Sequence, residues 1–179
     1  MKRQIELKSL SLACVFAAFA FAIRKLNILV IPLPFPPLVF DFRGVPAFIG
    51  SCLVPYYYAG FIGWAASEFD PLMGSSGWTD FSGWIPACVI CSLLYCTLKK
   101  RIRNRNIASS ISIIIGQTVG NVVFLVFRSI LFFYSVEPPL IFESFLIVLT
   151  VRSIITAIAA VPLLNAIEKA LNKLGLGET

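Results

Sequence analysis

The sequence predicts an all-α integral membrane protein that folds as a compact six-helix transmembrane bundle, with residues 1–179 in a single transmembrane domain. The 179 residues are 58% hydrophobic and 13% charged, with a mean hydropathy of +0.87, which excludes a water-soluble domain of ordinary composition. The apolar segments show no alternation of strand length, which favours helices over a barrel. Lysine and arginine gather at the segment ends, so membrane topology explains the net charge of +6 better than nucleic-acid binding does.

Six helices are expected between the polar clusters of the sequence. A cytoplasmic N-terminus would bring the main basic clusters onto one side of the plasma membrane, so we expect a multi-pass chain with both termini cytoplasmic. Arg24, Lys25 and Arg43 lie at the outer end, which weakens this pattern or gives these cations another role. The expected helices cover residues 5–23, 45–54, 55–68, 84–98, 108–134 and 142–171.

The first expected helix carries a stripe of small residues. Its basic start is typical of a signal peptide, but further apolar spans follow, so we expect the helix to be retained. Ala13 and Ala17 share one face with Ser9 and Ala20. Such a stripe permits close backbone approach, either to another helix of this chain or to a separate protein, and the residues alone do not separate the two.

The two connections expected on the outer side differ in character. Residues 27–41 contain four prolines and cannot form a continuous helix; being apolar, they are expected to form an extended lid over a pocket or, equally, an interfacial loop. Residues 70–82 are rich in glycine and serine and are expected to form a mobile loop. Trp78 in this loop either stacks on a planar ligand or joins Trp64 and Trp84 in an aromatic belt at the headgroups.

Residues 41–63 are expected to fold the chain back on itself within the membrane. Pro46 and Pro55 suit the first turns of two successive helices. The helix 45–54 is too short to cross about 30 Å of hydrocarbon, so other helices or a polar-lined cavity must shelter it. Three glycines allow either plain helix packing or room for a ligand beside the backbone: Gly50, Gly60 and Gly63.

Polar residues within the last two expected helices mark a candidate binding site. Gln117, Asn121 and Arg128 project from one face, and Arg128 should face an aqueous cavity, a carboxylate or the outer interface. Arg152 lies near mid-membrane, where it needs an internal partner or a bound anion. Glu143 lies on the opposite face of the same helix from Arg152, so it is expected to pair with Arg128 or to cap a helix start.

Residues typical of catalysis are not evident. The sequence has no histidine, GxSxG motif, Walker-type loop or paired carboxylates, so we expect no enzyme, no catalytic residues and no cofactor. All five cysteines lie in apolar segments. Cys88 and Cys91 form a CxxC, but a zinc site would need a second pair or histidines, so no metal site is expected and small core residues are the favoured interpretation.

Residues 41–63, DFRGVPAFIGSCLVPYYYAGFIG, resemble a segment of the substrate-binding S components of energy-coupling factor (ECF) vitamin transporters. The small-residue stripe, the six helices and the basic stretch after the fourth helix agree with that layout. The resemblance implies a bundle of ECF S-component type that binds its ligand in an outward-facing cavity. It also implies partners: a T subunit that docks on the face of Ala13 and Ala17, and two ATPase subunits. Gly44 and Val54 depart from the residues usual in the family, so no familiar ligand transfers to this chain.

The expected function is therefore that of the substrate-binding membrane subunit of an ECF-type importer that captures a vitamin or related micronutrient. Arg128 and Arg152 favour a ligand with a carboxylate or phosphate, and Trp78 and Trp84 would cover its apolar or planar part. The alternative is a membrane-embedded lipid-modifying enzyme or membrane assembly factor, which should open sideways between helices. The expected substrate-binding residues are Trp78, Trp84, Asn121, Arg128, Glu143 and Arg152.

Overall fold

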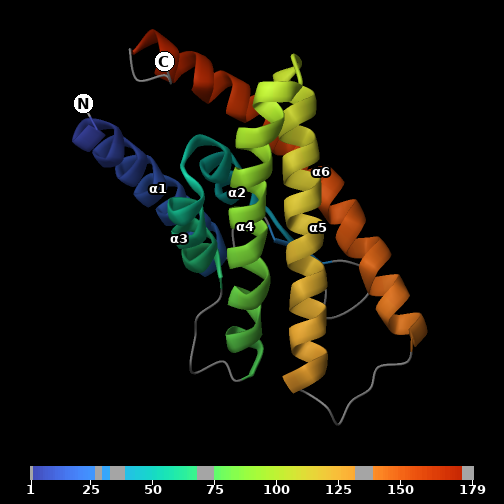
Figure 1. Ribbon diagram of the computed structural model, residues 1–179. Helices are drawn as coiled ribbons and strands as arrows, with labels where there is room; N and C mark the ends of the chain where they lie inside the picture. The colour runs from blue at the N-terminus through green and yellow to red at the C-terminus, as the bar shows by residue number, and fades with distance from the viewer. Residues whose placement is uncertain (1, 27–29, 33–38, 68–74, 132–138, 175–179) are drawn as a thin grey trace.

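The computed structural model describes residues 2–26, 30–32, 39–67, 75–131 and 139–174; within these, the side chains of 2–5, 30–32, 39–41, 75–79, 128–131 and 139–146 lie outside the description. The described residues form six helices and one small two-stranded sheet (Figure 1). The elements in chain order are α1 (Lys2–Lys25), β1 (Val30–Pro32), β2 (Val39–Asp41), α2 (Gly44–Leu53), α3 (Tyr56–Ala66), α4 (Ser75–Arg101), α5 (Arg105–Leu131) and α6 (Pro139–Lys173).

Four of these helices are long and apolar enough to cross a membrane, by length and composition. They confirm the predicted class, an all-α bundle with membrane-spanning helices. The candidate spans are Glu6–Lys25, Asp80–Arg101, Arg105–Phe127 and Ile147–Lys173.

The short helix α2 lies at the centre of the bundle. It packs against α1, α3, α4 and α6, and eight of its ten residues are buried. This confirms that neighbouring helices shelter a segment too short to span the membrane alone. The reversal into α3 falls at Pro55, as predicted from the two prolines. The carbonyl of Val54, at the C-terminal end of α2, accepts a hydrogen bond of 2.8 Å from Ser92 Oγ of α4, so it is satisfied inside the protein.

Small residues let α4 and α5 approach each other closely. A Cβ atom added at Gly120 would lie 2.5 Å from both the Cβ of Ala87 and the carbonyl oxygen of Gly83. Gly116 and Gly120, four residues apart, thus form a GxxxG face on α5 that receives Gly83 and Ala87 of α4. In the predicted hairpin, a Cβ at Gly63 would lie 2.5 Å from the carbonyl oxygen of Trp84. At these positions the glycines serve helix packing.

Helix α4 begins at Ser75, so the prediction of a loop over residues 70–82 is wrong for residues 75–82. Glycine and serine are typical of loops, but the tight packing of Gly83 on α5 stabilises a helix there despite the weak local propensity. Helix α5 also begins earlier than predicted, at Arg105. The side chain of Asn104 accepts a hydrogen bond of 3.0 Å from the backbone N–H of Asn106, as a helix-capping residue does.

The predicted non-helical connection over residues 27–41 is confirmed where it is described. β1 and β2 pair in antiparallel fashion, with Ile31 opposite Phe40. Residues 33–38, between the strands, lie outside the described residues. The lid that was predicted from this apolar stretch stays a prediction.

The stripe of small residues on α1 faces the inside of the bundle. Ala13 and Ala17 are 0% and 5% exposed, and α1 packs on α2 and α3. The small face is therefore used within the chain. Its docking on a separate T subunit stays a prediction, and in this arrangement a partner could reach Ala13 only after α1 had moved away from its neighbours. The outward surface of α1 instead carries larger side chains, among them Val15 and Phe19.

At one end of the bundle lie the N-terminus, the turn between α4 and α5, and the last part of α6 (Figure 1). We call it the basic end because α4 finishes there with Lys99, Lys100 and Arg101. Helix α6 changes direction along its length, so that its last turns extend past the end of α4 towards the side of the N-terminus (Figure 1). Pro162 lies inside α6 and lacks the backbone N–H that would continue the helical ladder, which accounts for a bend.

A polar cluster joins three helices at the basic end. Tyr95 of α4 donates a hydrogen bond of 2.8 Å to Glu168 Oε1 of α6. Arg105 at the start of α5 approaches the other oxygen of Glu168 at 3.4 Å. Asn165 of α6 donates to the side-chain oxygen of Asn106 of α5 at 2.8 Å. The end of α6 is thus held against the turn between α4 and α5.

Candidate functional site

The candidate site is built around Arg43, the residue that immediately precedes α2. Its side chain is buried, and Nη1 donates to the carbonyl oxygen of Ala66 at 2.8 Å and to Asp80 Oδ2 at 2.9 Å. Ala66 is the last residue of α3, and Asp80 lies in α4. One guanidinium therefore joins the start of α2, the end of α3 and the N-terminal half of α4, and it satisfies a helix-terminal carbonyl that has no partner within its own helix.

Trp84, one turn after Asp80 on α4, provides an aromatic face for two arginines. The guanidinium carbon of Arg43 lies 4.7 Å from the centroid of the Trp84 ring, and that of Arg152 on α6 lies 5.9 Å from it. Both distances are within the range of cation–π attraction. Trp84 is only 7% exposed and packs on Phe48 of α2 with the ring centroids 6.0 Å apart. It is therefore an interior residue, which argues against the alternative that it belongs to an aromatic belt at the headgroups.

Gly44 allows α2 to begin close to this cluster. A Cβ atom there would lie 3.3 Å from Thr156 Cγ2 of α6 and 3.5 Å from the indole of Trp84. Thr156 is buried and donates its hydroxyl to the carbonyl oxygen of Arg152 at 2.9 Å. The bare backbone of Gly44 thus lets α2, α4 and α6 converge at one point, which brings Arg43 and Arg152 to the same indole although they are far apart in the chain.

This arrangement can bind an anion that carries an apolar or planar part. A guanidinium presents a planar fork of donors that matches a carboxylate or a phosphate. An indole offers a large apolar face for a ring or an alkyl portion. Asp80 already occupies one donor of Arg43, so an anion reaching this group would either share the fork with Asp80 or displace it.

The predicted site residues divide into three groups. Trp84 and Arg152 are brought together. Asn121 Nδ2 donates to the carbonyl oxygen of Leu149 at 3.4 Å, which links α5 to α6, and its predicted part in binding stays a prediction. The side chains of Trp78, Arg128 and Glu143 lie outside the described residues, so their predicted parts in binding stay predictions.

Gln117, one turn before Asn121 on α5, is 3% exposed. Its Oε1 accepts no hydrogen bond from any described residue. A buried amide oxygen costs free energy unless a donor reaches it, so a water molecule or a ligand donor would be favoured there.

Sequence reasoning missed Arg43 and Asp80 as site residues. A signal existed for Arg43, which departs from the distribution of basic residues along the chain. Asp80 falls within the predicted loop 70–82, and only its position inside α4 directs it towards Arg43.

The cysteines contribute a compact group of thiols next to α2. Cys52, Cys88 and Cys91 are buried thiols, and the sulfur atoms of Cys52 and Cys91 lie 3.7 Å apart. These three behave as the expected small core residues, whereas Cys14 and Cys96 are exposed. Among the residues that the structure describes, no group of three or more cysteines and carboxylates is arranged to hold a metal ion.

Comparison with known proteins identifies no family for this chain. It matches no protein-family model, and no curated protein or solved structure is significantly similar to it. By the length and composition of its helices, the chain is a multi-pass helical membrane protein.

Proposed function

We propose that this chain is the substrate-binding membrane subunit, the S component, of an ECF-type importer. In this proposal it captures a vitamin or related small micronutrient in an outward-facing cavity. The observation that carries the proposal is the convergence of two guanidinium groups on the buried face of Trp84. A membrane protein rarely places cations inside its helices unless they bind something or are paired there.

The ligand class follows from the chemistry of the cluster. Arg152 would bind a carboxylate or phosphate of the ligand, and Trp84 would cover an apolar or planar part. Arg43 would hold the site together through Asp80 and the end of α3, and would add a second positive charge beside the ligand. Trp78, Arg128 and Glu143 would complete the outer part of the site, and Asn121 would keep α5 and α6 in register behind it.

Transport would require partner subunits, because the role proposed for this chain is substrate binding and does not include ATP hydrolysis. A T subunit and two ATPase subunits would supply the energy. The chain would lie in the plasma membrane with the basic end and both termini in the cytoplasm, in accord with the concentration of lysine and arginine there.

The test is purification of the full chain from its native membrane in mild detergent, followed by mass spectrometry of the small molecules and proteins bound to it. We expect a stoichiometric small anion, with or without a T subunit and ATPases. Arg152→Gln and Trp84→Leu should lose this molecule. Matched controls are Arg103→Gln and Trp64→Leu, which remove an arginine and a tryptophan from exposed positions away from the cluster and should retain it.

Two results would overturn the proposal. One is a bound phospholipid or lipid-linked intermediate in place of the small anion, which would favour a lipid-modifying enzyme or an assembly factor. The other is equal retention of the small anion by Arg152→Gln, Trp84→Leu and their controls, which would exclude the cluster around Trp84 as the binding site.

A further inference from the structure

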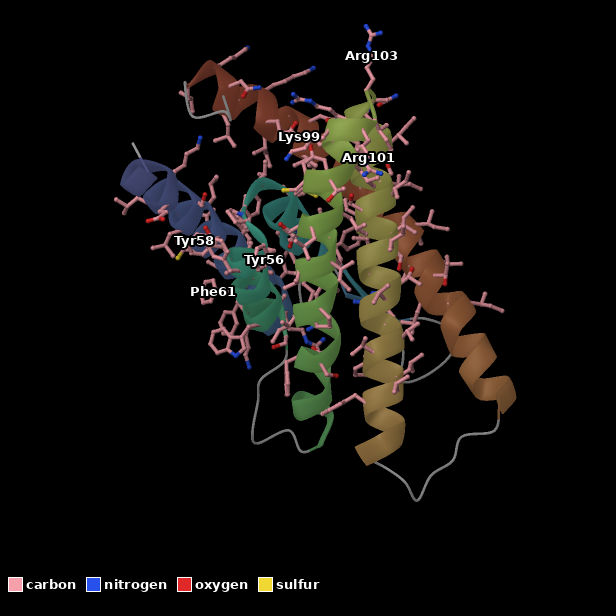
Figure 2. The ribbon with its side chains drawn as sticks, viewed as in Figure 1. Tyr56, Tyr58, Phe61, Lys99, Arg101 and Arg103 are labelled. Atoms are coloured by element: carbon pink, nitrogen blue, oxygen red, sulfur yellow. The ribbon has the colours of Figure 1, made fainter. Side chains whose placement is uncertain are left out.

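The basic end of the bundle carries a surface whose charge the proposed transport site does not use. Figure 2 shows Lys99, Arg101 and Arg103 where α4 turns into α5, with Arg103 at the tip. Lys100, Arg101 and Arg103 are exposed. Three cationic side chains thus lie within four consecutive residues, a density that attracts anions by their summed charge.

Among the described residues, the acidic side chain recorded at this end, Glu168, does not neutralise these three cations. Glu168 is 13% exposed at its side chain and is already engaged, because it accepts a hydrogen bond from Tyr95 and pairs with Arg105. Helix α6 adds two further exposed cations close to its C-terminus, Lys169 and Lys173.

The position of this surface identifies the class of its partner. The candidate span Asp80–Arg101 ends within it, and the span Arg105–Phe127 begins two residues after Arg103, so it lies where helices leave the hydrocarbon and meet the headgroup phosphates. Apolar side chains continue from it along the helices. Ile107, the third residue of α5, is 48% exposed, and Leu163 of α6 is 51% exposed. Cationic side chains that can bind a headgroup phosphate therefore lie next to an apolar surface that can contact acyl chains.

We propose that Lys100, Arg101 and Arg103 form a binding surface for anionic phospholipids of the adjoining leaflet. The headgroup phosphate would contact these three side chains, and the acyl chains would lie along α4 and α5. An acidic protein could supply negative charge as well, but the continuity of the basic surface with lipid-facing apolar residues favours a lipid. The surface is separate from the cluster around Trp84, so this inference does not depend on the proposed transport function.

The experiment compares two lipids on the full chain purified in detergent, where membrane insertion no longer affects the result. Native mass spectrometry would measure how many molecules of dioleoylphosphatidylglycerol or dioleoylphosphatidylcholine the protein retains, and at what concentration. We expect the wild type to prefer phosphatidylglycerol, with a preference that weakens at high salt because the contact is electrostatic.

The triple variant K100Q/R101Q/R103Q should bind phosphatidylglycerol at least about tenfold more weakly, because several cations contribute to such contacts. The charge-retaining variant K100R/R101K/R103K is the matched control and should bind as the wild type does. Lys99 and Arg105 stay unchanged in both variants, because Lys99 lies over the Tyr95 ring and Arg105 pairs with Glu168. Circular dichroism of the variants would verify that the helices are retained.

Equal retention of the two lipids by the wild type would overturn the proposal, and so would unchanged binding in the neutral triple variant. If the wild type shows no lipid preference and the neutral variant instead loses a co-purifying protein, the surface binds a protein and the lipid proposal is wrong. Retention of a small anion at the Trp84 cluster can be measured in the same samples, so failure of one proposal is distinguishable from failure of the other.

Discussion

Two arginine–carboxylate pairs lie in opposite surroundings in this bundle. Arg43 and Asp80 meet at 2.9 Å with side chains 6% and 18% exposed, whereas Arg105 and Glu168 meet at 3.4 Å with Arg105 55% exposed. The buried guanidinium also bonds to the end of α3 and lies over Trp84. The exposed one competes with water and salt for its partner. A buried ion pair therefore contributes more to holding the helices together, because water cannot solvate a buried charge that has lost its partner.

The largest expected effect comes from breaking the buried pair. Arg43→Met should lower the free energy of unfolding by about 3–5 kcal/mol, because it leaves the Asp80 carboxylate without its guanidinium in a mostly buried position. Chemical unfolding in mixed detergent micelles, followed by circular dichroism, would measure this loss.

The double variant Arg43→Met with Asp80→Asn is the control for that measurement. Removing both charges should recover part of the stability, and the non-additivity gives the coupling between the two residues. If Arg43→Met unfolds with the same free energy as the wild type, the buried pair is not the joint between α2, α3 and α4 that its geometry indicates.

An intermediate effect should follow from disturbing the packing beside the buried pair without changing a charge. Gly63→Ala places a methyl group 2.5 Å from the carbonyl oxygen of Trp84, so α3 must move away from α4. Overpacking of this kind costs about 1–3 kcal/mol, measurable by the same unfolding experiment. Gly60→Ala is the matched control, because its new methyl would only meet Val89 at 3.4 Å. Equal effects of the two variants would contradict close backbone packing at Gly63.

The smallest expected effect comes from breaking the exposed pair. Arg105→Gln should change the free energy of unfolding by less than about 1 kcal/mol, since Arg105 is largely solvated and Glu168 keeps its hydrogen bond from Tyr95. High salt should reduce even this difference. A loss as large as that of Arg43→Met would mean that exposure does not separate the two pairs, and the comparison would fail.

Several features of the fold could be predicted because they depend on local chemistry. Proline has no backbone N–H to donate to a helix, so the sequence alone predicts the break over residues 27–41 and the start of α3 after Pro55. The need to shelter α2 follows from its length against the thickness of the hydrocarbon. The start of α4 could not be predicted in this way, because the packing of Gly83 on α5 outweighs the weak helix propensity of glycine and serine.

The candidate site was only partly predictable. The cost of placing Arg152 in a membrane helix marked it as a residue with a partner or ligand, but the cost does not say which group it meets. Arg43 and Asp80 are 37 residues apart in sequence, and no local pattern links them. The sequence also predicts the amide of Asn121 as a ligand-binding group, but it does not predict the hydrogen bond that this amide donates to the carbonyl oxygen of Leu149 on the neighbouring helix.

The sequence by itself determined that this protein is a helical membrane protein, roughly where its helices break, and which end is basic, because composition, proline and charge act on the chain locally. Only the tertiary structure decided that the small face of α1 is used inside the bundle and that Arg43 and Arg152 share the indole of Trp84. The physical reason is that a membrane helix can turn any of its faces towards a neighbour. Close packing between particular helices selects one face, and that selection is made in three dimensions.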